Sequence, residues 1–123
     1  MIHVLVWIGV AAFGALGALE RFQVGNAVAA RRPSDFPYGT FVVNLSGGFA
    51  LGVLTGLSLT GDELLVLGTG FLGAYSTFST WMVEAQRLGE NGDWQFMWLY
   101  LFGSMLAGLG TTGLGWLLGG AIR

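Results

Sequence analysis

The chain has little charge, no cysteine and a single histidine. Its 123 residues include seven acidic and five basic side chains; charged residues make up 10% of the total and hydrophobic residues 54%. A soluble surface usually carries about 25–35% charged residues, so the composition favours a membrane protein over a soluble bundle of buried helices. Without cysteine there is no disulfide framework and no thiol chemistry.

Long charge-free runs predict an all-α membrane protein with four transmembrane helices in one domain, residues 1–123. Each run is close to or above the ~20 residues that span the hydrocarbon core of a bilayer. No room is left for a nucleotide-binding or catalytic module, so we do not expect an enzyme. The expected helices cover residues 4–29, 38–59, 64–87 with a break near 73–77, and 94–121.

The third expected helix has an unusual middle. Residues 68–81 contain three glycines and five serines or threonines, with no charge between Leu64 and Val83. In lipid, backbone that leaves the helix survives only if it is buried in protein or lines a polar cavity. Broken helices of this kind bind ions in transporters, so the pattern predicts an ion site.

Arginine supplies all the basic residues, and its distribution bears on orientation. Arg31, Arg32 and Arg87 lie in the first and third connections, with Arg21 nearby, whereas the side of the termini carries only Arg123. Basic residues favour cytoplasmic loops. The arginines thus favour cytoplasmic first and third connections without excluding both orientations.

Seven polar side chains within the expected helices are neutral hydrogen-bond donors. Such donors suit a small anion that must shed water and leave again, because conduction needs sites that bind weakly. The ring edges of Phe78 and Trp81 carry positive quadrupole density and offer a further weak contact. In the alternative interpretation these residues only bond neighbouring helices or their own backbone. The donors are Asn44, Ser76, Thr77, Ser79, Thr80, Tyr100 and Ser104.

Four motifs in order carry a family resemblance. They are GALGALER at residues 14–21, GTFVVNLSGG at 39–48, GFLGAYSTFSTW at 70–81, and Tyr100 with Ser104 in the last helix. Taken together, they make the chain resemble the Fluc (CrcB) family of small fluoride channels over essentially its whole length.

The resemblance implies an antiparallel, dual-topology dimer in the plasma (inner) membrane, with two pores that passively export fluoride. Arg21 matches a basic residue near the aqueous vestibule. Gly73 and Ser76 match the break whose backbone carbonyls hold a central structural sodium ion. The residues that match the fluoride pore are Asn44, Phe78, Ser79, Thr80, Trp81, Tyr100 and Ser104.

Two positions depart from the family pattern. Trp81 stands where a phenylalanine is usual, and Gly108 stands where a further hydroxyl is often found. These departures leave open a heterodimer with a second homologous chain, or a partner whose own pore has degenerated. A proton-coupled small multidrug transporter is a further alternative, but its membrane-embedded glutamate would have to be Glu20, which lies late in the helix beside Arg21.

Overall fold

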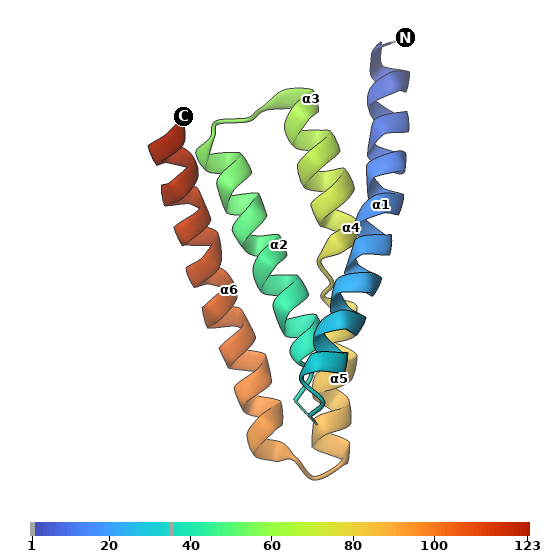
Figure 1. Ribbon diagram of the computed structural model, residues 1–123, viewed down its shortest axis with the longest axis vertical. Coiled ribbons are helices and arrows are strands. Elements are labelled where there is room, and N and C mark those ends of the chain that lie inside the picture. Colours follow the sequence, from blue (N-terminus) through green and yellow to red (C-terminus); the bar gives the residue numbers. More distant parts are fainter. Residues whose placement is uncertain (1, 35) are drawn as a thin grey trace.

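The structure is a computed structural model that describes residues 2–34 and 36–123, and the regular structure in these residues is helical. Both termini lie at the same end of the molecule (Figure 1). The elements in chain order are α1 (Ile2–Arg31), α2 (Tyr38–Gly56), α3 (Gly61–Leu64), the π-helix η1 (Leu65–Leu72), α4 (Gly73–Tyr75), α5 (Ser79–Glu90) and α6 (Trp94–Ile122).

Helices α2 and α6 run side by side along most of their length (Figure 1). Glycine makes this close approach possible. A Cβ atom at Gly52 would fall on the backbone of Thr112, and one at Gly115 would fall on the backbone of Phe49. Small residues let helix backbones approach in lipid, where packing rather than burial from water drives association. The α2–α6 pair is therefore a tightly packed scaffold.

Helix α1 packs against η1 and α4. Gly17 of α1 faces the carbonyl of Phe71, and Gly70 of η1 faces the backbone of Val10. Because no side chain separates these backbones, α1 holds the segment before the break in place.

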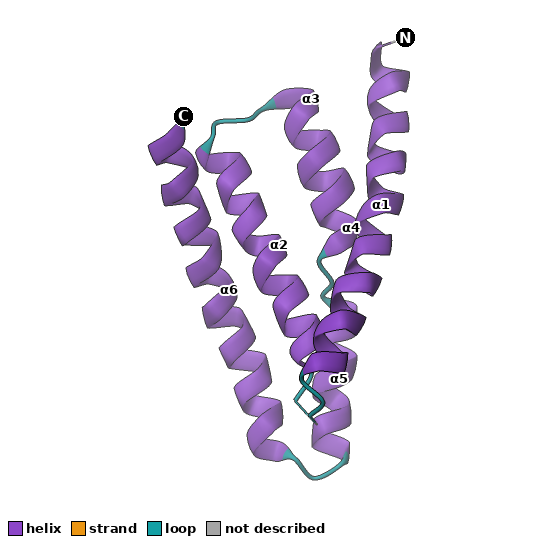
Figure 2. Cartoon of the chain, viewed as in Figure 1, coloured by secondary structure: helices purple, strands orange, loops and turns teal. Residues whose placement is uncertain are grey.

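The segment expected as one broken helix is a series of shorter elements. The π-helix η1, which the sequence did not predict, continues into α4, and residues 76–78 then leave the helix before α5 begins (Figure 2). We expected the break near 73–77, but Gly73–Tyr75 is still helical. The non-helical stretch begins later because Thr77 bonds a side chain of α2, as described below.

Of the described residues, three helices are long and apolar enough to cross a membrane: His3–Arg31, Tyr38–Gly56 and Trp94–Ile122. The third expected span does not qualify as one helix because it is divided. Large apolar side chains such as Phe22, Leu106 and Leu109 remain more than half exposed in the single chain. An outer surface of this kind is typical of a multi-pass membrane protein, where lipid or another subunit covers it.

Candidate functional site

A groove of about 420 Å³ opens beside the break, between α2, the segment from η1 to α5, and α6. Both ends of the break contribute to it through Ser76 and Phe78. The lining residues that the sequence had singled out are Asn44, Gly73, Ser76, Thr77, Phe78, Trp81, Ser104 and Gly108. Residues far apart in the chain thus meet in one groove.

Asn44 fastens the break to α2. Its Nδ2 donates to the carbonyl of Thr77 at 2.9 Å, and its Oδ1 accepts from the Thr77 N–H at 2.8 Å. The amide therefore satisfies both the N–H and the C=O of Thr77, a residue that lies outside the helices. One N–H of Nδ2 is left over from this pair of bonds, since an amide nitrogen has two donors. Asn44 is thus an interhelical staple and also lines the groove.

This staple changes the environment of the Gly73 carbonyl. In an uninterrupted α-helix the Thr77 N–H would bond the carbonyl four residues earlier, which is that of Gly73. Here the N–H is given to Asn44 instead. Gly73 is exposed in the single chain, and a Cβ atom there would meet only the Gly68 carbonyl, at 3.8 Å. The Gly73 carbonyl therefore lacks its regular helical donor, in an exposed residue that lines the groove.

Phe78 and Trp81 form an aromatic pair at the groove. Their ring centroids lie 5.7 Å apart with an interplanar angle of 88°, so one ring presents its edge to the face of the other. Phe78 is 68% exposed. The Trp81 indole N–H donates to the carbonyl of Tyr100 at 3.4 Å, a long bond. The indole donor is therefore directed at α6 and not into the groove.

Ser104 brings a hydroxyl from α6. It is only 7% exposed, and among the residues that the structure describes its Oγ has no hydrogen-bond partner. A buried polar atom without a partner is costly and is an indication of function or of a missing partner. Ser104 also lines the groove, so a buried hydroxyl with an unused donor lies beside it.

Tyr100 lies one turn away from Ser104 but in a different environment. It is fully buried, and its hydroxyl donates to Glu84 Oε1 at 3.2 Å. Its ring packs edge-on against Phe36 with centroids 5.3 Å apart. In the described part of the chain it lines neither the groove nor the larger cavity. The Tyr100 side chain thus lies outside the groove in the single chain, although the Tyr100 carbonyl contacts the Trp81 indole.

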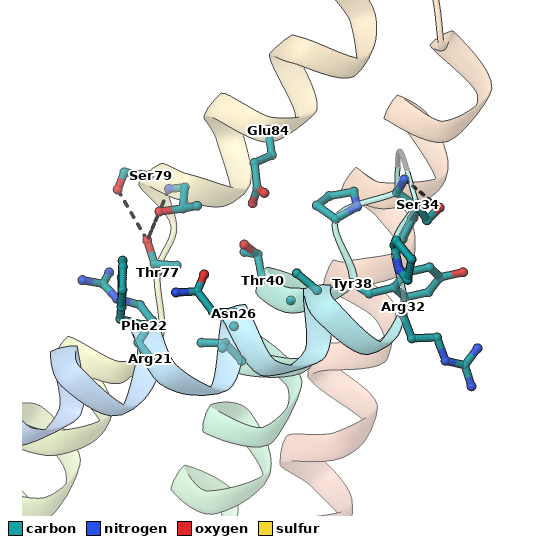
Figure 3. Close-up of a pocket in the computed structure, with 18 of the residues that line it drawn as sticks. Arg21, Phe22, Asn26, Arg32, Ser34, Tyr38, Thr40, Thr77, Ser79 and Glu84 are labelled. Atoms are coloured by element: carbon teal, nitrogen blue, oxygen red, sulfur yellow. Dashed lines mark hydrogen bonds between the residues drawn. The ribbon is translucent and has the colours of Figure 1, made fainter.

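A larger cavity of about 850 Å³ lies on the other side of the break, at the end that carries the first connection (Figure 3). Arg21, Ser79 and Thr80 line it, together with Glu84. The Thr77 hydroxyl donates to Thr80 Oγ1 at 3.1 Å and accepts from the Thr80 N–H at 3.2 Å, so it caps the start of α5. Thr77 lines both spaces and stands between the larger cavity and the groove.

Several polar residues that we had not selected also line these spaces, among them Asn26, Thr40 and Thr112. Asn26 and Thr40 point into the larger cavity from α1 and α2 (Figure 3), and Thr112 lines the groove. Thr112 continues the four-residue spacing of Tyr100, Ser104 and Gly108, so the sequence held that signal. Asn26 had no such signal, because its position depends on how α1 crosses the break.

Comparison with known proteins identifies relatives over nearly the whole chain. The family model described as "CrcB-like protein, Camphor Resistance (CrcB)" matches residues 8–116. Proteins named "Fluoride-specific ion channel FluC 2" are 47% identical in Mycobacterium tuberculosis, over 91% of this chain and 89% of the relative, and 57% identical in Mycolicibacterium paratuberculosis, over 74% and 75%. "Fluoride-specific ion channel FluC 1" of Leifsonia xyli is 42% identical over 94% and 88%. These relatives are named as ion channels and not as enzymes.

Proposed function

The chain belongs to the CrcB-like protein family, and on that premise we propose that it is a fluoride-selective channel that passively exports fluoride across the plasma (inner) membrane. The named relatives support the transported ion. The observation in this chain that carries the proposal is the buried Ser104 hydroxyl, which has no partner among the described residues and lines the same groove as Asn44 and the Phe78–Trp81 pair.

The chemistry of the groove suits an anion that binds briefly. Ser104 offers an O–H donor, and Asn44 has one N–H beyond those used to hold Thr77. No lysine, arginine or histidine is among its lining residues in the described part of the chain, so the anion would meet neutral donors that release it again. Phe78 adds a ring edge of positive electrostatic potential.

The larger cavity would serve as the aqueous entrance. Arg21 attracts anions there, and Ser79 and Thr80 carry hydroxyls next to it. Glu84 shares the cavity and opposes the arginine, so the entrance does not hold an anion as a purely basic pocket would. Fluoride would pass Thr77 to reach the groove, because Thr77 lines both spaces.

We expect two subunits in antiparallel orientation to form the working channel. Phe78 is largely exposed in the single chain, as are many apolar residues of α6. A second copy would cover these side chains and turn each open groove into an enclosed pore, which gives two pores per dimer.

A structural sodium ion would bind at the centre of this dimer, on the carbonyls of Gly73 and Ser76. The chemistry of these residues supports such an ion. The Gly73 carbonyl has lost its regular helical donor to Asn44, and Gly73 is exposed. Hard backbone oxygens from unwound helix suit sodium, so the residues fit. Prolonged removal of sodium should lower fluoride flux and dimer content, whereas sodium-independent assembly and flux would exclude this assignment.

Fluoride efflux from proteoliposomes that contain this chain alone tests the proposed function. A channel requires a potassium ionophore for charge balance and shows no coupling to a pH gradient. Obligatory proton exchange would instead indicate a coupled transporter of the small multidrug type, in which Glu20 would have to act as the proton site.

Trp81 and Gly108 are the reason to test one alternative assembly, a heterodimer with a second homologous chain. Both residues line the groove at positions that depart from the family pattern. Efflux that appears only when a second homologous chain is added would favour the heterodimer, while efflux from this chain alone would favour the homodimer.

A further inference from the structure

We propose that Tyr75 is a positioning residue: its hydroxyl fastens the end of α4 to Ser46 of α2 and so sets the direction of the Ser76 carbonyl. The inference rests on the proposed function, because the Ser76 carbonyl matters only if it binds the sodium ion. Neither Tyr75 nor Ser46 was among the candidate site residues.

The bond between the two hydroxyls is short and its direction can be assigned. Tyr75 Oη and Ser46 Oγ lie 2.8 Å apart, and Ser46 Oγ also lies 3.1 Å from the Val43 carbonyl. A hydroxyl has one hydrogen. Because the serine gives its hydrogen to the carbonyl, the tyrosine donates to the serine. Tyr75 is 8% exposed, so this bond is sheltered from competing water.

Together with Asn44, this bond fastens the chain on both sides of Ser76. Tyr75 is held by Ser46, and Thr77 is held by Asn44 through two bonds. With both neighbours attached to the same helix, the peptide groups on either side of Ser76 cannot rotate freely. The N–H and hydroxyl of Ser76 both donate to the Leu72 carbonyl, at 3.0 and 2.9 Å, which leaves its own carbonyl as the group to be directed.

The packing around Tyr75 explains why a hydroxyl is needed there. Helix α4 is the last part of the helical run that continues from η1, and no helical turn follows Tyr75 to hold this end. Gly47 of α2 lies against it: a Cβ at Gly47 would be 3.3 Å from the Tyr75 ring and 3.4 Å from the Ser76 Cβ. Contact of this kind limits how far the ring can move, but it does not fix the orientation of the backbone at Tyr75. The directional hydrogen bond to Ser46 does.

The Tyr75→Phe variant isolates the hydroxyl. The tyrosine ring stacks on Phe71 with centroids 6.0 Å apart and an angle of 11°, and phenylalanine keeps that contact. We expect the amides of Ser76 and Thr77 to exchange with deuterium about three- to tenfold faster in this variant, as for the loss of one sheltered hydrogen bond. The amides of α6 should be unaffected. The sodium concentration for half-maximal fluoride flux should rise by a similar factor.

Three further variants make the experiment selective. Tyr38→Phe removes a hydroxyl from another ring that packs on a phenylalanine, Phe36 at 4.8 Å, but at the start of α2 in the larger cavity, and should leave the exchange of the Ser76 and Thr77 amides unchanged. Ser46→Ala should reproduce the effect of Tyr75→Phe, and the double variant should be no worse than either single one, because all three lose the same bond.

The outcomes separate this proposal from the proposed function. Unchanged exchange in Tyr75→Phe, or additive effects in the double variant, would overturn the fastening. Faster exchange with an unchanged sodium requirement would overturn the positioning role. Exchange needs no fluoride. A wild-type chain without fluoride flux, both alone and with a second homologous chain, would contradict the proposed function while the fastening of α4 could still be measured.

Discussion

The α2–α6 pair and the segment from α4 to α5 satisfy their backbone hydrogen-bonding groups in different ways. In the pair, each helix satisfies its own backbone groups, and glycines such as Gly52 and Gly115 let the two helices touch. Between α4 and α5 the helix is interrupted, and side chains from α2 satisfy the backbone of Thr77 and fix Tyr75.

The difference assigns each region a task. The packed pair tolerates no added atoms at its contact, but it has no backbone oxygen to offer an ion. The interrupted segment presents carbonyls and donors, and it depends on the pair to hold it. Asn44 and Ser104 connect the two regions, since they lie on α2 and α6 and both line the groove beside the break.

The largest effect is expected for Asn44→Asp. The change removes the Nδ2 donor to the Thr77 carbonyl and places a carboxylate in the groove, where it would repel an anion. A charge within the membrane-spanning part costs about 2.5–3.5 kcal/mol, and we expect fluoride efflux to fall about a hundredfold. Proteoliposome efflux at equal protein content measures this.

Asn91→Asp is the matched control, because Asn91 is exposed at the end of α5, outside the groove. It should conduct like the wild type. Unchanged efflux in Asn44→Asp would show that conduction needs neither the Asn44–Thr77 bonds nor the Asn44 donor. Asn44 would then not connect the packed pair to the interrupted segment in function.

The packed pair is tested by Gly115→Ala. The added Cβ would overlap the Phe49 backbone, which cannot move without separating α2 from α6. Overpacking of this kind costs about 1–3 kcal/mol, so we expect a lower melting temperature and about tenfold less efflux. Gly113→Ala in the same helix meets nothing within 4 Å and should behave as the wild type. Equal stability of the two variants would show that the contact is not tight.

Much of the packed pair could be predicted from the sequence. The bounds expected for the first, second and last helices lie within three residues of those in the structure, because charges and prolines mark the ends of the apolar runs. In the sequence, Gly48, Gly52 and Gly56 recur every four residues, a spacing that is typical of a helix contact face. Helix-forming patterns are local, and so they can be read from the chain alone.

The interrupted segment could be predicted only in part. Its glycines and hydroxyls indicated that the helix is not continuous, but the position of the break depends on Asn44, which lies 33 residues away from Thr77. The burial of Tyr100 against Phe36 likewise depends on where the first connection folds. Contacts between distant residues leave no periodic signal, so the groups that complete the site could not be assigned by pattern.

A smaller effect is expected for Ser104→Ala, with opposite signs in stability and flux. The wild-type hydroxyl is buried without a partner among the described residues, so its removal should leave the melting temperature unchanged or slightly higher. Flux should fall about three- to tenfold, because the permeating anion loses one donor. Thermal unfolding and efflux of the same preparation measure both. A joint decrease in stability and flux would mean that Ser104 belongs to the packed pair alone.

The smallest effect is expected for Trp81→Phe. The indole N–H makes a 3.4 Å bond to the Tyr100 carbonyl and does not point into the groove, so the loss of this donor should matter little to the anion. A phenylalanine can keep the edge-to-face contact with Phe78 and occupies less of the groove. We therefore expect fluoride efflux that is equal to that of the wild type or at most about threefold higher, since one long hydrogen bond is worth little. A collapse of efflux with normal folding would show that the indole donor is required, and it would move Trp81 from the aromatic wall to the groups that bind the ion.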